Sequence, residues 1–363
     1  MKIIKFSAFG LLIIILPILL AFTMEKDEPS IKEPIKKEKR TSDRGIYVTA
    51  STAQSSSRLN YLIKQCKNLN LNTMVIDVKE VVKTDALELA KEKMLNSDFV
   101  VEPSEWLKKL TARLHEEGFI VTARVVAFKD DHLVIARPDL GIHLAGGALY
   151  RDRKGGRWAN PYLREVRLYN EIISEIAAAS GVDEIQFDYI RFPTEGAAKS
   201  IPYNTKTTKV EIINEFLKGT KARLDKYNVS LAVDIFGITA WQDLKDVNSL
   251  GQSLEAMSKY LDVLSPMLYP SHFHAGYDGF SNPGSYPYHF MNTGVKKSQE
   301  ILASAECTTK LVPWIQGFNM RSPNFGSNYI REQIKACHDE GIDSFLIWNA
   351  RNVYDSVPKY IGF

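Results

Sequence analysis

The sequence contains little cysteine and none of the glycine-rich motifs that bind nucleotide phosphates. Its three cysteines, Cys66, Cys307 and Cys337, are too scattered along the chain to form a disulfide framework or a zinc cluster. We therefore expect free thiols, which are usually buried. The first strand-like run is not followed by GxGxxG or a P-loop, and no GxSxG marks a serine nucleophile. The sequence gives no indication of a cofactor.

An excess of one charge is also missing. The chain has 46 basic and 43 acidic residues, a formal net charge of +3. Because no basic stripe is interleaved with aromatic residues, we expect no nucleic-acid partner. His272 and His274 in SHFHAGYDG have metal-binding spacing, but no further ligands are identifiable, so we expect no metal site. A hydrophobic content of 45% and a charged content of 25% are typical of a globular protein.

The first 43 residues differ from the rest of the chain. Lys2 and Lys5 precede 17 residues without a charge, so residues 1–24 are expected to be a signal peptide or signal anchor. The positive flank predicts that the body lies outside the cytoplasm, either secreted or anchored in the membrane through this segment alone. Residues 25–43 are rich in lysine, glutamate and proline, which predicts a charged flexible linker.

From residue 44 onward, eight apolar strand-like runs alternate with helical patterns. The runs are RGIYVTA (44–50), TMVIDVKE (73–80), FIVTARVVAF (119–128), EIQFDYIRF (184–192), VSLAVDIFGI (229–238), LDVLSPMLY (261–269), KLVPWIQGF (310–318) and IDSFLIWNA (342–350). An insertion follows the second run and a long irregular segment follows the third. The alternation predicts parallel strands joined by crossover helices, and eight such units predict a (β/α)8 TIM barrel with loop insertions over residues 44–363. An open doubly wound sheet is the competing arrangement.

Asparagine or glycine follows the helical patterns before four of these runs. The motifs are NLNLNT, EEGF, SGVD and DEGID. We expect these residues to end the helices in the left-handed conformation.

Polar residues collect late in the strand-like runs, where barrel enzymes place their active sites. Asp77, Asp188 and Asp234 occupy such positions on three different runs, and Arg124 and Arg191 can neutralise part of their charge. Paired carboxyl groups are what glycoside hydrolysis requires. We expect Asp188 to be the nucleophile or base, held ionised by a neighbouring arginine, and Asp234 to be the general acid. The expected substrate-binding residues are Asp77, Arg124, Arg191, Tyr269, Trp314, Gln316, Trp348 and Asn349, with Trp158 and Trp241 as further aromatic candidates.

Several motifs also carry a family resemblance. GVDEIQFDYIRFP, with RGIYVTA, NTMVIDVKE and PWIQGF, resembles a bacterial glycoside hydrolase domain family of unknown function, distantly related to the α-amylase superfamily. The resemblance covers residues 44–360 and implies a (β/α)8 barrel with glycosidase activity. In α-amylase-like barrels the fourth strand supplies the nucleophilic aspartate, which here would be Asp188. The fifth strand supplies a glutamate acid and the seventh a further aspartate, whereas this chain has Asp234 in the fifth and no acid in PWIQGF.

Two functions remain open on these observations. The first is an O-glycosyl hydrolase that acts on an extracytoplasmic polysaccharide or glycoconjugate. The second is a non-catalytic carbohydrate-binding barrel at the cell surface, which the missing acids favour. Glu80 and Glu195, each just past a strand-like run, are alternative acids. The basic segment RDRKGGRWANP (151–161) is either a contact for an anionic glycan or an ordinary exposed loop.

Overall fold

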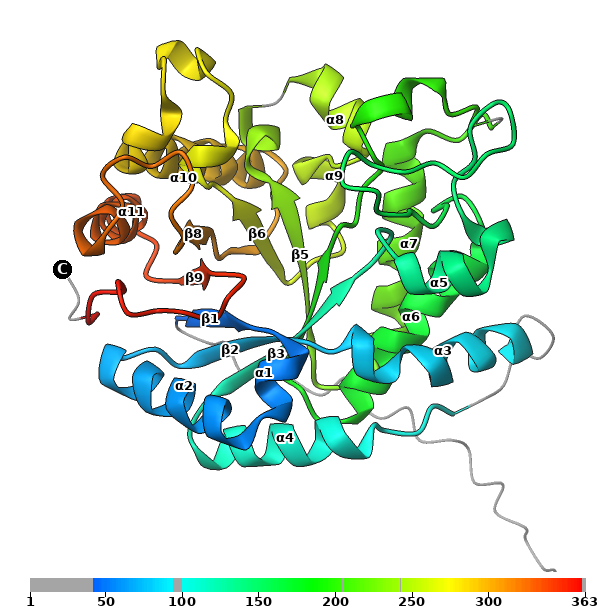
Figure 1. The fold of residues 1–363 in the computed structure, drawn as a ribbon, viewed down its shortest axis with the longest axis horizontal. Helices are drawn as coiled ribbons and strands as arrows, with labels where there is room; N and C mark the ends of the chain where they lie inside the picture. The colour runs from blue at the N-terminus through cyan, green and yellow to red at the C-terminus, as the bar shows by residue number, and fades with distance from the viewer. Residues whose placement is uncertain (1–41, 94–99, 204, 242, 361–363) are drawn as a thin grey trace, which may run out of the picture. The chain divides into compact units, whose positions relative to one another are not determined.

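The computed structural model describes residues 42–93, 100–203, 205–241 and 243–360 (Figure 1). The hydrophobic segment 1–24 and most of the charged segment 25–43 lie outside the described residues. Within the described part, none of the helices combines the length and the apolar character that a membrane span requires.

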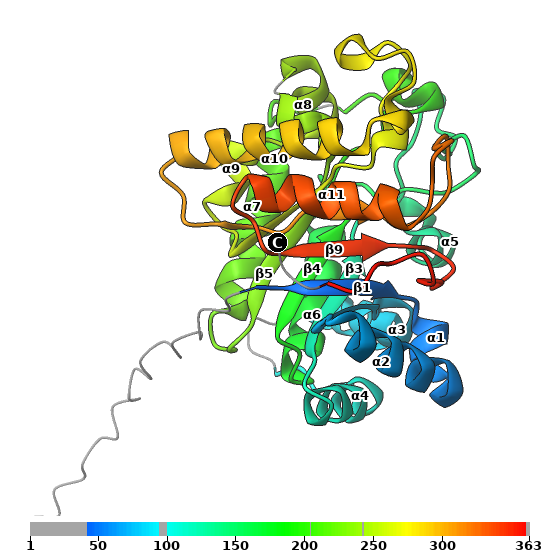
Figure 2. The same ribbon diagram turned by 90° about the vertical axis from the view of Figure 1, so that its left-hand side faces the viewer.

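The described residues form one closed barrel of parallel strands, which confirms the (β/α)8 fold and excludes the open sheet. The strands are β1 (Arg44–Val48), β2 (Thr73–Asp77), β3 (Ile120–Val126), β4 (Glu184–Asp188), β5 (Ser230–Phe236), β6 (Val263–Met267), β7 (Lys310–Leu311), β8 (Trp314–Gln316) and β9 (Phe345–Trp348). They follow one another around the barrel in chain order, with β7 and β8 sharing one position beside β6. The pairing of β1 with β9 closes the barrel, and Figure 2 shows these two strands side by side and pointing the same way.

Proline explains why the seventh strand is divided. β7 and β8 come from the single run KLVPWIQGF, and Pro313 lies between them. Val312 still donates its backbone N–H to the Leu264 carbonyl at 2.9 Å, but Pro313 has no N–H to continue the ladder. The strand therefore resumes only at Trp314.

Helices cover the outside of the barrel (Figure 1). They are α1 (Ala50–Gln54), α2 (Ser56–Leu69), α3 (Lys79–Lys93), α4 (Glu105–Glu116), α5 (Asp131–Ala136), α6 (Arg164–Ala179), α7 (Lys209–Leu224), α8 (Leu244–Leu250), α9 (Leu254–Ser258), α10 (Pro287–Ser304) and α11 (Ser327–Asp339). Part of the expected insertion after the second strand is helical, because α3 forms there and packs against α6. Short 3-10 turns, with longer irregular stretches, make up the loops after β4 and β6, and the loop after β3 also contains α5.

Burial on both faces makes the strands nearly continuous runs of apolar residues. In β2, Met74, Val75 and Ile76 are all buried. Met74 and Ile76 belong to the large cluster between strands and helices, whereas Val75 packs inside the barrel with Tyr47 and Trp314. This alternation decides which late-strand residues point into the barrel and can meet there.

The ends of the elements match several local expectations. Asn70 follows α2 with φ 58°, and Gly118, Gly181 and Gly341 have φ values of 83°, 90° and 76°, which confirms the four left-handed caps. The three cysteines are free, with Cys66 and Cys337 buried.

The folded body begins earlier than residue 44. Asp43 is buried, and its carboxylate forms an ion pair with Lys310 Nζ at 3.0 Å. Its backbone N–H donates a hydrogen bond to Ser344 Oγ at 3.0 Å. Asp43 therefore belongs to the barrel rather than to the charged linker that we expected to include it.

Candidate active site

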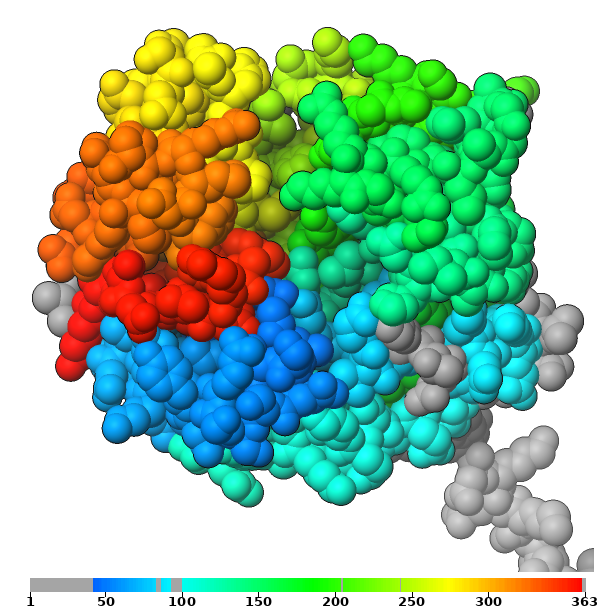
Figure 3. Space-filling model, viewed as in Figure 1, coloured from blue at the N-terminus to red at the C-terminus, as the bar shows by residue number. Residues whose placement is uncertain are grey.

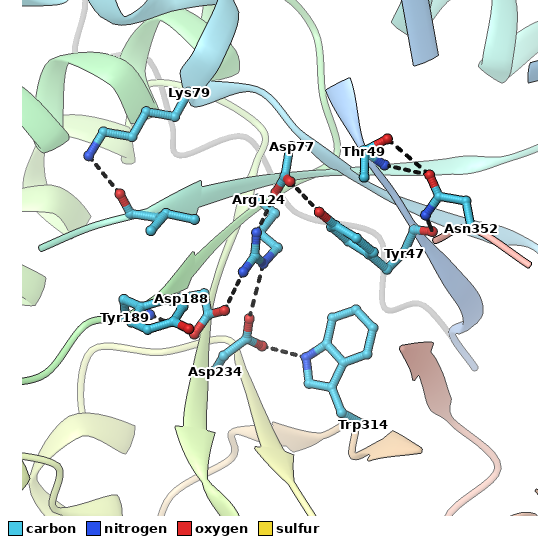
Figure 4. Close-up of polar contacts among 11 residues, drawn as sticks. Tyr47, Thr49, Asp77, Lys79, Arg124, Asp188, Tyr189, Asp234, Trp314 and Asn352 are labelled. Atoms are coloured by element: carbon cyan, nitrogen blue, oxygen red, sulfur yellow. Dashed lines mark hydrogen bonds and ion pairs between the residues drawn. The ribbon is translucent and has the colours of Figure 1, made fainter. Parts of the chain in front are cut away.

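Arg124 gathers the three expected carboxylates at one end of the barrel (Figure 4). Its guanidinium pairs with Asp77 through Nη1 and with Asp188 through Nη2, and its Nε lies 3.9 Å from Asp234 Oδ2. Burial alone would lower the pKa of Arg124, but the charges of Asp77 and Asp188 raise it well above its ordinary value. Arg124 is therefore a permanent positive centre among the acids.

Asp188 ends β4 and is held on both carboxyl oxygens. Oδ2 accepts from Arg124, and Oδ1 accepts the backbone N–H of Tyr189 at 2.6 Å. Both contacts stabilise a negative charge on Asp188. Tyr189 itself has φ 50°, a left-handed conformation that is strained for an aromatic residue and that occurs often at functional turns.

Asp234 has the opposite environment. It is almost completely buried, and Oδ1 accepts the indole N–H of Trp314 at 2.5 Å. Burial, and then the charge of Asp188, raise the pKa of Asp234 well above its ordinary value, against the weaker opposing effects of Arg124 and Trp314. The hydrogen bonds to Asp188 thus favour a negative charge there, whereas the surroundings of Asp234 favour its protonated form, which is the division that a base and an acid need.

The raised pKa of Asp234 predicts a pH-dependent cost to folding. Between the ordinary aspartate pKa and the raised one, the folded chain keeps a proton that the unfolded chain has lost. Stability therefore falls with rising pH by up to about 1.4 kcal/mol per pH unit. Asp234→Asn keeps the acceptor for Trp314 but cannot ionise, so we expect the variant to gain stability relative to the wild type as pH rises. Urea unfolding across the pH range measures the difference.

Trp314→Phe is the companion variant for this prediction. It removes an N–H that favours ionised Asp234, so the pH range over which stability falls should extend upward. A constant stability difference between Asp234→Asn and the wild type across pH would contradict a protonated Asp234.

A cavity of about 150 Å³ opens above these carboxyl groups. It is lined by Arg124, Asp188, Tyr189, Arg191, Asp234, Phe236, Met267, Tyr269, His272, Trp314 and Trp348. Figure 3 shows the surface hollowed where the green segment between β3 and α6 faces the orange and red segments after β8 and β9. A second cavity of about 330 Å³ shares Arg124 and Tyr189 and continues past Asp77 and Glu80. The site therefore extends on both sides of Tyr189.

Aromatic side chains form much of the wall. Trp348 stacks on Tyr47 with ring centroids 3.9 Å apart and lies 4.9 Å from the Arg124 guanidinium. Tyr269 is buried in the cavity wall, and its hydroxyl has no hydrogen-bond partner among the described residues. Trp158 is buried against Arg191, whereas Trp241 packs with Phe273 and Phe290 and does not line either cavity.

Arg191 does not neutralise the acids as we expected. It lines the cavity, but among the described residues its guanidinium makes no ion pair with Asp188 or any other carboxylate. Arg124 holds Asp188 instead, because parallel pairing of β3 and β4 brings their late residues together.

Gln316 and Asn349, unlike Arg191, line neither of the two cavities. The Gln316 amide accepts from the Ser271 backbone at 3.1 Å and donates to Ser322 Oγ at 2.8 Å. Asn349 donates to the carbonyls of Gly317 and Val353 at 2.7 and 2.8 Å. Both amides hold loops at the barrel end, and their expected contact with substrate stays a prediction.

The sequence analysis did not single out Tyr189, Phe236 and Met267, which line the first cavity, or Tyr47, which supports Asp77 beside it. It considered His272 only as a metal ligand, whereas the structure places this residue in the cavity lining. Tyr47 donates its hydroxyl to Asp77, and its late place on β1 is the signal that would have found it. The His272 side chain is exposed at the edge of the cavity, and desolvation by the surrounding protein, with the charges of Arg321 and Lys154, lowers its pKa to about 4. In the part of the chain that the structure describes, no three metal-ligating side chains come together. Glu80 and Glu195 are exposed.

Comparison with solved structures shows the same architecture. The glycoside hydrolase domain of PgaB (BpsB) from Bordetella bronchiseptica superposes with a TM-score of 0.58 at 14% identity, covering 85% of this chain and 94% of that one. An endo-1,4-beta-D-mannanase from Thermotoga petrophila gives 0.53 at 13% identity, covering 88% and 94%. A hypothetical protein from Ruminiclostridium thermocellum is 30% identical, with 52% and 97% covered and a TM-score of 0.43. No curated protein matches the chain.

At 13–14% identity these likenesses show the fold alone. A match to a family model shows family membership as well as fold, because it extends over residues 45–354 and thus over nearly the whole barrel. The family is described as "Putative glycosyl hydrolase domain". Its extent agrees with the resemblance drawn from FDYIRFP and the accompanying motifs. The chain is therefore a glycosidase-type barrel and belongs to this glycosyl hydrolase domain family.

Proposed function

We propose that the barrel hydrolyses a glycosidic bond, with Asp188 as nucleophile or base and Asp234 as general acid. The observation that carries the proposal is the opposite environment of two carboxyl groups in one cavity. Arg124 pairs directly with Asp188 but lies 3.9 Å from Asp234. The nearly complete burial of Asp234, beside the charge of Asp188, favours its protonated form.

The reaction would follow from these two states. Asp234 donates its proton to the glycosidic oxygen as the bond to the leaving sugar breaks. Asp188 attacks the anomeric carbon or deprotonates the water that does so. Arg124 remains charged throughout and stabilises whichever of the acids is negative, and Trp314 supplies an N–H to the Asp234 carboxylate after proton transfer.

The aromatic wall supports a sugar as the ligand. Trp348 is partly exposed in the cavity, and the Tyr189 ring borders both cavities, so each offers surface against which a pyranose can pack. A substrate spanning Tyr189 would place sugars on both sides of the carboxyl pair. We further propose that this substrate is an extracytoplasmic polysaccharide or glycoconjugate, because the uncharged run after Lys2 and Lys5 is of the kind that directs a chain out of the cytoplasm.

A glycan panel tests the proposal. The chain is incubated with polysaccharides and cell-wall glycans, and the new reducing ends are counted. We expect release from at least one glycan and none from Asp188→Asn. Binding of a glycan without any release of reducing ends would favour the non-catalytic carbohydrate-binding barrel instead.

A further inference from the structure

Arg191 is a buried cation that faces the cavity. It follows β4, and its side chain is only about one-twentieth exposed. Among the described residues, its hydrogen bonding is limited to one bond, from Nη1 to the Phe192 carbonyl at 3.1 Å. The other nitrogens of Arg191 have no hydrogen-bond partner among the described residues, and none of them is fully enclosed by protein. Their N–H groups therefore open to the cavity that Arg191 lines.

Aromatic rings, rather than carboxylates, hold this guanidinium in place. Its carbon lies 4.3 Å from the ring centroid of Phe236, 4.8 Å from Trp158 and 5.2 Å from Tyr189. Rings that stack on the faces of a guanidinium leave its edge, which carries the N–H donors, available. Asp188 and Glu195 act on the charge only from beyond ion-pair distance.

Other buried arginines in the described barrel show what Arg191 lacks. Arg124 pairs with Asp77 and Asp188, and Arg167 pairs with Glu215 at 2.8 Å. Burying a charge without an opposite charge is costly, so such a group persists where a function requires it. At Arg191 the counter-ion would have to come from whatever occupies the cavity.

Further positive charge acts on His272, which lines the same cavity as Arg191. Lys154 and Arg321 are both exposed, and their charges help to lower the pKa of His272, which lines this cavity beside Arg191. Asp77 lines only the second cavity. Arg191 thus lines the first cavity together with His272, on which the positive charges of Lys154 and Arg321 act, whereas Asp77 lines only the second cavity.

We propose that Arg191 binds an anionic group carried by a sugar of the substrate, which makes the preferred glycan an acidic one. The group is a carboxylate, phosphate or sulfate, whose oxygens match the paired donors along the guanidinium edge. The identification of the ligand as the substrate's own sugar rests on the proposed glycosidase function. The anion-binding role of Arg191 rests on its burial and its missing counter-ion.

Binding of uncleavable monosaccharides to the full chain tests the proposal. Glucuronate and glucose differ at C6 alone, and glucose 6-phosphate and glucose 6-sulfate show which anion is preferred. By calorimetry we expect at least one anionic sugar to bind about tenfold or more tightly than glucose. Arg191→Gln should remove that preference and leave glucose binding unchanged, whereas Arg191→Lys should keep part of it. Arg331→Gln, on the outer face of α11, is the matched control and should behave as the wild type.

Two results would overturn the proposal: equal binding of charged and neutral sugars by the wild type, or a charge preference that survives Arg191→Gln. If Arg191→Gln does not fold, the wild-type comparison and Arg191→Lys decide. Hydrolysis is measured separately, on an acidic glycan and on the same glycan after chemical reduction of its carboxyl groups. Charge-selective binding without release of reducing ends from any glycan would contradict the hydrolase and leave the anion subsite standing.

Discussion

Asp188→Asn is expected to lower hydrolysis on the order of 10³-fold or more while leaving the barrel folded. The amide oxygen can still accept from Arg124 or from the Tyr189 backbone, so the shape and most of the contacts of Asp188 persist. The amide cannot attack an anomeric carbon or take a proton. Reducing-end assays and thermal unfolding on the same preparation separate the chemical from the structural effect.

Asp183→Asn is the matched control for this variant. Asp183 precedes β4, at the opposite end of the strand, and its carboxylate accepts the Val121 backbone N–H at 2.7 Å. We expect wild-type hydrolysis from it, because it is remote from both cavities. If Asp188→Asn instead melted much lower but kept its activity per folded molecule, Asp188 would be only a structural partner of Arg124.

Arg124→Gln is expected to destabilise the barrel by about 3–5 kcal/mol at neutral pH, because it leaves the buried carboxylate of Asp188 and the half-buried carboxylate of Asp77 without their cation. Hydrolysis should fall as well, since ionised Asp188 would lose its main support. Urea unfolding at pH 7.5 and at pH 5 measures the stability loss.

The loss should shrink on acidification. Without Arg124 the folded chain holds protons on these carboxyl groups up to a higher pH than the unfolded chain does. The free energy of unfolding of Arg124→Gln should therefore rise as the pH falls. Asp188→Asn in the Arg124→Gln background should restore part of the stability by removing one of the stranded charges.

Arg167→Gln is a control with a similar degree of burial. Arg167 pairs with Glu215, whose side chain is 58% exposed, so its removal strands no buried carboxylate. The stability that Arg167→Gln loses should be nearly the same at both pH values. A pH-independent loss for Arg124→Gln would mean that its packing, and not its charge, supports the site.

Much of the fold was predictable because local patterns carry it. Each of the eight apolar runs contains a strand, and Asn70 and Gly181 cap helices where a left-handed residue was expected. In a parallel barrel, burial on both faces forces such runs, so they are visible in the sequence. The helix α3 was missed because its apolar residues do not follow a clear helical stripe.

The positions of the acids followed from the same logic. Asp77, Asp188 and Asp234 come late in their strands, and parallel strands bring late residues to one end. The sequence did not reveal which cation pairs with each acid, or which acid has a raised pKa. Arg191 is three residues from Asp188 in the chain, yet Arg124, from the neighbouring strand, makes the ion pair.

Position along the chain was thus enough to place the carboxyl groups at a common end of a barrel. The alternation of strands and helices, and the late position of each acid in its strand, can be read from local residues. Only tertiary packing decided which charges touch. Strand register set Arg124 between Asp77 and Asp188, and nearly complete burial beside Asp188 raises the pKa of Asp234. Packing also turned Gln316 and Asn349 to loop backbone and left Arg191 open to the cavity. Desolvation and pairwise charge act through distances of a few ångströms in space, and sequence separation does not encode those distances.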